Sequence, residues 1–287
     1  MRLANYAGRG TILAADDHGV DVYKASGGRF GPDMTGLYER WEEFTAWVSG
    51  LSDVQADVVV DRSLLLSPSP MPRQVFAIGL NYSDHAAESG FAQPEDFPPV
   101  FTKFQTCITG PDTTVALPEG GNTDWEVELV AVIGLKAKKV AEADAWDYVA
   151  GLSIGQDISE RVSQLRGPAP QFALAKSFPG FGPVGPWLVT PDEFPNPNYL
   201  ELGCSLNGVE VQRGRTSDLI FSVPALIAGL SATVTLLPGD ILFTGTPAGV
   251  GVGRTPNRFI QPGDTLVSRI QSIGEMTQTF VSARASN

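Results

Sequence analysis

The most informative segment of this 287-residue chain reads Asp124-Trp125-Glu126-Val127-Glu128-Leu129-Val130-Ala131-Val132-Ile133-Gly134. Its run of apolar, largely β-branched residues is typical of a strand. Side chains two positions apart on a strand point to the same face. Glu126 and Glu128 should therefore project together, with Val130 and Val132 continuing that face. The residues between them should face the other way.

Two carboxylates on one face of an apolar strand need a compensating partner. Like charges so close repel each other and raise one pKa, and burial penalises the charged form further. A hard cation such as Mg²⁺ or Mn²⁺, which prefers carboxylate oxygens, would neutralise Glu126 and Glu128. Alternatively, the segment is an edge strand whose polar face lies in water. The pattern by itself favours the edge strand.

A third carboxylate strengthens the metal interpretation. Asp157 follows the apolar run 152–156 and precedes a turn or short helix. It could cap that helix, or it could be a third ligand. Hard octahedral ions often take carboxylates from separate strands and keep positions open to water. Glu126, Glu128 and Asp157 are therefore the candidate metal ligands.

The chain has two histidines, so a histidine base has few candidates. His18 lies in an Asp-Asp-His-Gly segment, where we expect a solvated side chain. His85 precedes Glu88 by three residues, which on a helical turn puts both on one face. A carboxylate can orient an imidazole and stabilise its charged form. Taken alone, the two residues are more simply explained as an exposed pair.

Short apolar runs alternate with Gly and Pro turns, which is typical of many short strands. We predict strands at 75–78, 100–103, 125–133, 149–154, 202–206, 241–244, 265–270 and 276–281. Asn207-Gly208 predicts a tight hairpin.

Helices are expected to be few. We predict them at 37–48, 143–148 and 224–232, with Ser222 capping the last. The first carries an aromatic stripe that we expect to pack in the core: Tyr38, Trp41, Phe44 and Trp47. A Ser/Pro-rich link at 67–72 marks a predicted boundary between a small N-terminal α/β domain, residues 1–70, and a larger domain, residues 71–287. The fold class expected is α+β, mostly β.

Composition narrows the functional class. The net charge is −12, and Lys and Arg form no cluster, which argues against nucleic acid as a partner. The two cysteines suggest buried free thiols rather than disulfides. Neither a signal peptide nor an apolar stretch long enough for a bilayer is evident. We expect a cytoplasmic protein with a small-molecule partner.

Several motifs together resemble the fumarylacetoacetate hydrolase family, over residues 71–284. The segment 78–82 followed by His85 and Glu88 resembles the family's lid-borne His–Glu dyad. Glu-x-Glu at 126–128 and Asp157 match its metal ligands. The resemblance implies a mixed β-roll or sandwich, preceded by the family's variable N-terminal domain, and, as in many relatives, a homodimer.

The resemblance also implies further roles. Arg161, Gln164 and Thr246, the last in the Gly-Thr-Pro loop 245–251, would contact substrate, and Lys176 would be catalytic. The chain departs from the family pattern at Pro179, where many members carry Asp, and at Ala175, where Gly is common. Both lie near the expected substrate end of the site.

The activity implied is hydrolysis of an acylpyruvate, a 2,4-dioxo acid, to pyruvate and a carboxylic acid. A Mg²⁺ or Mn²⁺ ion would be chelated by the substrate's carboxylate and 2-oxo oxygen. Decarboxylation of oxaloacetate, or isomerisation or tautomerisation of a 2-oxo diacid, is the alternative with the same metal site. A binding module with structural Ca²⁺ is a second alternative.

Two weaker expectations concern single side chains. Lys103 is a possible site residue, but a surface lysine at a strand end is the interpretation we prefer. The residues expected to line the substrate pocket are Phe91, Phe97, Phe178, Phe181 and Trp187.

Overall fold

In the computed structural model, which describes residues 1–51, 55–88, 90 and 92–283, strand β11 (Val127–Ile133) lies inside the main sheet. It pairs with β12 (Val149–Gln156) on one side and β17 (Ile241–Phe243) on the other, both antiparallel. Every residue of β11 is buried. The edge-strand interpretation is therefore wrong, because a strand from more than 100 positions later in the chain covers the second edge.

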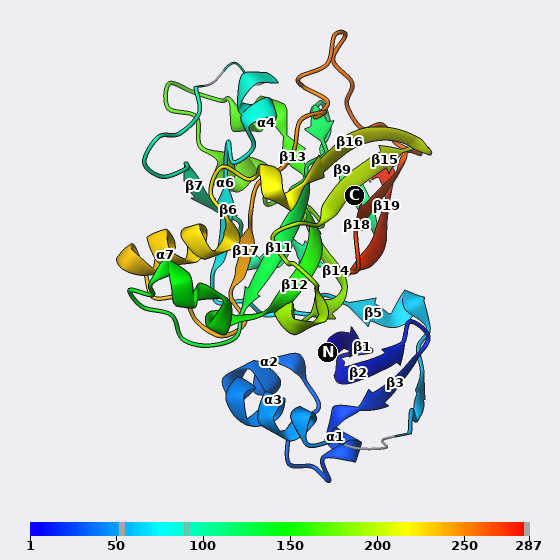
Figure 1. Ribbon diagram of the computed structural model, residues 1–287. Helices are drawn as coiled ribbons and strands as arrows, with labels where there is room; N and C mark the ends of the chain where they lie inside the picture. The colour runs from blue at the N-terminus through cyan, green and yellow to red at the C-terminus, as the bar shows by residue number, and fades with distance from the viewer. Residues whose placement is uncertain (52–54, 89, 91, 284–287) are drawn as a thin grey trace.

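The main sheet is long and mixed (Figure 1). Its order is β4-β3-β2-β1-β14-β12-β11-β17-β6-β7, with β5 on β1 and β8 on β14. The remaining strands of this sheet are β1 (Arg2–Tyr6), β2 (Arg9–Ala15), β3 (His18–Asp21), β4 (Val58–Val59), β5 (Leu65–Leu66), β6 (Val75–Ile78), β7 (Val100–Thr102), β8 (Ile108–Thr109) and β14 (Gly182–Val189).

A second sheet has the order β16-β15-β18-β19-β9, and β10 pairs with β13 alone. These strands are β9 (Asp112–Leu117), β10 (Thr123–Asp124), β13 (Ser159–Glu160), β15 (Glu201–Leu206), β16 (Val209–Arg215), β18 (Thr265–Ile270) and β19 (Gly274–Ser282). The predicted hairpin joins β15 to β16. Asn207 and Gly208 have φ of 52° and 79°, the left-handed conformation that a type I′ turn requires.

The two faces of β11 pack into different parts of the core. Val127 and Leu129 belong to one cluster of buried apolar side chains, and Val130 and Val132 to another. This is the alternation predicted from the sequence. Burying such a side chain stabilises the fold by roughly 1.5–3 kcal/mol. Because apolar side chains cover both faces, the strand holds its polar end, where the glutamates lie, in a fixed position.

The predicted helix 37–48 is divided into α2 (Met34–Glu39) and α3 (Trp41–Ser49). Arg40 leaves helical geometry, with φ −126° and ψ 36°. Tyr38 and Trp41 stack across this break with ring centroids 5.4 Å apart. Both rings are buried together with Phe44, as predicted. Core packing of the aromatic rings therefore outweighs the continuity of the helix.

The other α-helices of the described residues are α1 (Val22–Ala25), α4 (Ser83–Glu88), α5 (Arg161–Gln164), α6 (Phe172–Ala175) and α7 (Val223–Thr233). Ser222 caps α7 as predicted, its side chain accepting a hydrogen bond from the backbone N–H of Ala225. The predicted helix 143–148 is a 3₁₀ helix, Glu142–Tyr148. Among the described helices, none is both long and apolar enough to cross a bilayer.

The N-terminal strands continue the main sheet, because β1 pairs with β14. The boundary at residue 70 stays a prediction. In Figure 1, α1–α3 lie at the opposite end of the molecule from α4, the helix that carries His85. The mostly-β mixed fold expected from the sequence is confirmed.

Candidate active site

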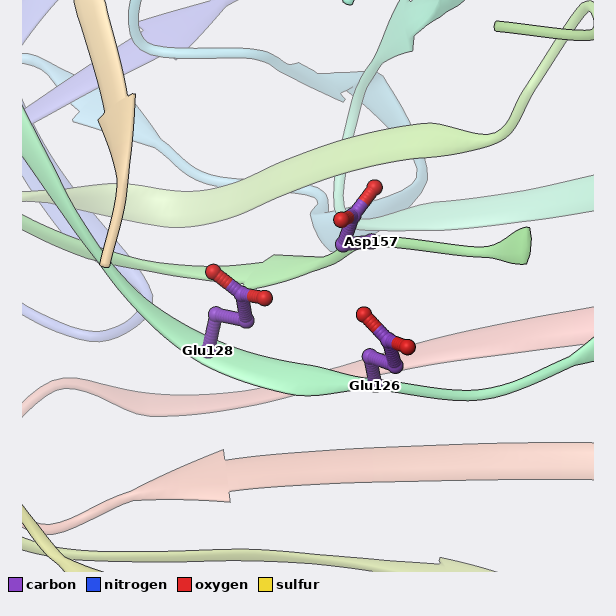
Figure 2. A group of neighbouring side chains, drawn as sticks. All are labelled: Glu126, Glu128 and Asp157. Atoms are coloured by element: carbon purple, nitrogen blue, oxygen red, sulfur yellow. The ribbon is translucent and has the colours of Figure 1, made fainter. Parts of the chain in front are cut away.

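Three carboxylates converge where β11 and β12 meet. Glu126 directly precedes β11, Glu128 lies within it, and Asp157 directly follows β12. The backbone N–H of Asp157 donates to the carbonyl of Glu126 at 2.9 Å, which continues the strand pairing to this point. Figure 2 shows both glutamates on the same side of one strand and Asp157 beside them, on the segment that follows the neighbouring strand β12.

This carboxylate cluster has the donor set of a hard-cation site. All three residues are buried, and one oxygen from each lies within 4.8 Å of the others. Glu128 uses Oε2 to accept a hydrogen bond of 2.7 Å from the N–H of Gly245, a glycine with φ of +102°. Burial and the charges of Asp157 and Glu126 raise the pKa of Glu128 well above its usual value. The residues present therefore fit Mg²⁺ or Mn²⁺.

Lys176, directly after α6, bridges two of the three acids. Its Nζ lies 2.6 Å from Oε2 of Glu126 and 2.6 Å from Oδ2 of Asp157. Burial by itself would raise the pKa of Glu126, but the charges of Lys176 and Arg161 lower it to about 2. Glu128 is the member of the cluster that has no Lys or Arg partner among the described residues.

Lys103 is buried at the back of the cluster. Its Nζ lies 2.7 Å from Oδ1 of Asp157 and donates to the carbonyl of Phe181 at 3.1 Å. Its side chain is 0 % exposed, so the preferred interpretation, a surface lysine at a strand end, is wrong. A buried Asp157 needs a charged partner, and Lys103 provides one.

Arg161, the first residue of α5, connects the cluster to a fourth acid. Its Nη2 lies 2.8 Å from Oε1 of Glu126 and 2.7 Å from Oδ2 of Asp124. Its Nη1 donates to Oε1 of Gln164 at 2.9 Å. Burial would lower the pKa of Arg161, but Asp124 and Glu126 raise it above its usual value, so the guanidinium stays charged. Gln164 keeps its amide NH₂ for other partners.

Asp124 is a site residue that the sequence analysis missed. It is fully buried, and besides Arg161 it accepts hydrogen bonds from the N–H groups of Gly251 (2.7 Å) and Val252 (3.0 Å). The alternation that paired Glu126 with Glu128 extends back to Asp124. Applying the same rule two residues further would have identified it.

His85 and Glu88 are brought to this site by α4. Nδ1 of His85 lies 3.6 Å from Oε2 of Glu88, and their side chains are 11 % and 18 % exposed. The simpler interpretation, an exposed pair, is wrong. Glu88 also accepts the N–H of Gly249 at 3.0 Å. Burial alone would raise the pKa of Glu88, but His85 and this backbone donor lower it below its usual value.

Asn81 anchors the segment that leads into α4. Its side chain donates to the carbonyls of Phe221 (3.0 Å) and Thr244 (2.8 Å) and accepts the N–H of Phe221 (2.8 Å). The sequence analysis noted Asn81 only as part of a motif. Its contacts lie more than 130 residues away in the chain, which no local pattern reveals.

One cavity of about 510 Å³ unites the predicted residues. It is lined by His85, Glu88, Glu126, Glu128, Arg161, Gln164, Lys176 and Thr246. Asp157 lies beside the cavity, with its oxygens turned to Lys103 and Lys176. The hydroxyl of Thr246 donates to the carbonyl of Val127 (2.9 Å) and accepts from Gln212 (2.8 Å).

The aromatic lining predicted for this cavity is largely wrong. Phe181 and Trp187 are buried in the core, Phe97 and Phe178 pack against it, and Phe91 lies outside the described residues. Phe101 and Phe172 line the cavity instead. The rings that line the cavity come from β7 and α6.

The chain belongs to the fumarylacetoacetate hydrolase family. Residues 74–281 match the family model described as Fumarylacetoacetate (FAA) hydrolase C-terminal. A protein of Burkholderia cenocepacia (strain HI2424) named "Putative hydrolase" is 40 % identical over 274 residues, covering 87 % of this chain and 96 % of the relative. The resemblance stated from the motifs is confirmed.

Solved structures of the same fold cover almost the whole chain. A "putative HpcE protein" from Mycobacterium smegmatis has a TM-score of 0.94 and 55 % identity over 99 % of this chain and 100 % of its own. Maleylpyruvate hydrolase from Sphingobium sp. SYK-6, in complex with manganese(II) and pyruvate, has a TM-score of 0.78 and 30 % identity over 99 % of this chain and 100 % of its own. A 5-carboxymethyl-2-hydroxymuconate delta-isomerase from Mycobacterium smegmatis has a TM-score of 0.76 and 30 % identity over 99 % of this chain and 100 % of its own. The similar proteins thus include hydrolases and isomerases.

Proposed function

We propose that this protein is a Mg²⁺- or Mn²⁺-dependent hydrolase that cleaves an acylpyruvate into pyruvate and a carboxylic acid. The observation that carries the proposal is that Glu126, Glu128, the His85–Glu88 pair and Lys176 line one cavity, with Asp157 beside it as the third member of the carboxylate cluster. A metal site alone would suit a binding module, but such a module needs no base beside the ion. The structural-Ca²⁺ alternative offers no reason for His85 to be there.

The metal would be held by Glu126, Glu128 and Asp157, whose oxygens converge on one point. When bound, it would act as a Lewis acid that polarises the 2-oxo group of the substrate. For Asp157 and Glu126 to turn their oxygens to the ion, Lys176 would have to release them. This frees its Nζ at the edge of the cavity.

His85 is the general base of the proposed reaction. It takes a proton from water, and the water oxygen attacks the 4-oxo carbon of the acylpyruvate. The bond between carbons 3 and 4 then breaks, and its electron pair and a proton go to carbon 3 to give pyruvate. Glu88 stabilises the charged imidazole at a distance of 3.6 Å from Nδ1.

Lys176, Arg161 and Gln164 serve the anionic substrate. The Nζ of Lys176 would stabilise the oxyanion formed on the 4-oxo group. Arg161 and Gln164 would donate hydrogen bonds to the carboxylate, since Gln164 has a free NH₂ among the described contacts. Thr246 would be a weaker substrate contact, because its hydroxyl already donates to the carbonyl of Val127 and accepts from the side chain of Gln212.

An assay of acylpyruvate loss tests the proposal. The purified protein, stripped of metal with EDTA, should be inactive and should regain turnover with Mg²⁺ or Mn²⁺. Incubation in H₂¹⁸O should place ¹⁸O in the carboxylic acid product. If no acylpyruvate is consumed with either metal, the hydrolase assignment is wrong.

A second candidate rests on the similarity to the delta-isomerase. The same site could isomerise or tautomerise a 2-oxo diacid, or decarboxylate oxaloacetate, without adding water to carbon. Release of CO₂ from oxaloacetate, or a product isomeric with the substrate and free of ¹⁸O, would favour this group of reactions. A homodimer and a cytoplasmic location stay predictions, and sedimentation analysis tests the first.

A further inference from the structure

The part of the cavity beyond the carboxylate cluster is walled by apolar side chains. The wall comprises Leu80, Pro99, Phe101, Leu165, Phe172 and Val252. They come from five separate segments: the stretch before α4, β7 and the residue before it, the end of α5, α6, and the loop after Gly251. A substrate bound at the acidic end would direct its other end toward these groups.

The apolar wall begins directly beside Lys176. The ring of Phe101 lies 5.0 Å from the Nζ of Lys176. Phe172 packs edge-on against Phe101, with centroids 5.5 Å apart and an interplanar angle of 69°. Leu165 is 61 % exposed and Val252 36 %, so the wall extends to solvent. Apolar surface left open at the mouth of a polar site gains from covering by an apolar ligand group.

Both cations that line the cavity act at its acidic end, where the proposed reaction uses Arg161 for the 2-oxo acid carboxylate and Lys176 for the 4-oxo group. Arg161 contacts Asp124, Glu126 and Gln164. Lys176 contacts Glu126 and Asp157. Within the described residues, the cavity lining contains no further Lys or Arg. A second carboxylate placed against the wall would lose its water without gaining a charged partner. The net charge of −12 also disfavours a more highly charged substrate.

Building on the hydrolase function proposed above, we propose that the enzyme selects monocarboxylic acylpyruvates with an apolar acyl group and discriminates against diacids. The wall formed by Leu80, Pro99, Phe101, Leu165, Phe172 and Val252 holds the acyl group. This distinguishes the chain from the similar maleylpyruvate hydrolase, whose named substrate is a diacid. It also disfavours oxaloacetate and 2-oxo diacids as substrates of this site.

A matched pair of substrates tests the proposal. Butanoylpyruvate and succinylpyruvate have the same chain and differ only in a terminal methyl or carboxylate group. With Mg²⁺, kcat/KM should be at least about tenfold higher for butanoylpyruvate, the scale on which pocket contacts of this size discriminate. An equal or higher value for succinylpyruvate overturns the proposal and leaves the hydrolase function standing.

A positive charge placed in the apolar wall provides a second test of the proposal. Leu165→Lys should raise kcat/KM for succinylpyruvate and lower it for butanoylpyruvate. Leu174→Lys is the matched control, since Leu174 is 73 % exposed on neighbouring α6 but does not line the cavity. An unchanged substrate ratio in the Leu165 variant, or the same shift in both variants, contradicts the assignment of the wall.

Binding separates this inference from the hydrolase function. Calorimetric titration of both acids into the Mg²⁺-loaded His85→Ala variant measures preference without turnover. If neither acid is hydrolysed by the unaltered enzyme, the hydrolase function is overturned, and tighter binding of butanoylpyruvate still supports the apolar wall. Equal or tighter binding of succinylpyruvate, or no binding of butanoylpyruvate, overturns the wall as the acyl site.

Discussion

Asp124 meets Arg161 through a single oxygen: its Oδ2 accepts a hydrogen bond of 2.8 Å from Nε and forms an ion pair with Nη2 at 2.7 Å. Its other oxygen, Oδ1, accepts the N–H of Gly251. One buried carboxylate therefore fixes both the guanidinium and the loop that borders the cavity. With its plane fixed in this way, Arg161 reaches Glu126 at 2.8 Å.

Asp124→Asn should lower kcat/KM by about 10–100-fold, the usual cost of removing a group that orients a site. The asparagine cannot hold the guanidinium by charge, so KM should account for most of the loss if Arg161 binds substrate. Steady-state kinetics with an acylpyruvate measures this. Asp112→Asn is the control, because Asp112 pairs with Arg62 away from the cavity. Equal losses in both variants would mean that Asp124 has no special role.

Asp157→Asn and Glu126→Gln should each weaken the binding of Mg²⁺ or Mn²⁺, because each removes one of three converging carboxylates. The loss of affinity should exceed the roughly tenfold effect of many supporting residues. Isothermal titration of the metal into metal-free protein measures it. Unchanged affinity in both variants would remove these residues from the metal site.

His85→Ala should reduce kcat by about 10²–10⁴-fold, the typical contribution of a general base. Metal affinity should stay near that of the unaltered protein, since His85 is not among the converging ligands. His18→Ala is the control, because His18 is exposed beside Asp17 in the N-terminal part of the chain. Turnover at the normal rate in His85→Ala would exclude His85 as the base.

Asp21→Asn should reduce stability near neutral pH and much less in acid. Asp21 accepts from Nε (2.6 Å) and Nη2 (3.0 Å) of Arg9 and caps α1 through the N–H of Lys24. The hydrogen bond from Arg9 lowers the pKa of Asp21 in the folded protein. Its stabilisation is therefore present above the unfolded pKa of about 3.9 and is lost as pH falls through the folded pKa.

The expected cost near neutral pH is about 0.2–1 kcal/mol, that of a partly exposed ion pair, because asparagine still caps α1 but carries no charge to face Arg9. Urea unfolding of both proteins at neutral pH and at successively lower pH, down through the folded pKa of Asp21, measures the difference. A difference that is constant or larger in acid would contradict the assigned pairing.

The sequence alone was enough to predict the periodic parts of the fold. The strands predicted at 75–78 and 265–270 coincide with β6 and β18, because short apolar runs between turn residues leave little choice of register. The same two-residue period placed Glu126 and Glu128 on one face. The residues themselves also singled out Asp157 and His85, and the motif resemblance then assigned their roles and added Lys176; one cavity and its edge bring the three together.

What the sequence could not predict depends on contacts between distant segments. Whether β11 is an edge or an interior strand depends on β17, and that pairing leaves no trace in the segment 124–134. The sequence around Lys103 is typical of a surface lysine at a strand end, and only the buried Asp157 beside it explains why it is buried. The rings of Phe101 and Phe172 reach the cavity only because β7 and α6 pack together.

The contact of Glu88 with Gly249 links two properties that are usually separate. The carboxylate that faces His85 is also the group that fastens α4 to the 245–251 loop. Any swing of α4 away from that loop would therefore break the contact of Glu88 with Gly249 and carry His85 and Glu88 together away from the carboxylate cluster. With α4 displaced, the general base would lie away from the metal ligands, and only the closed form would be able to activate water.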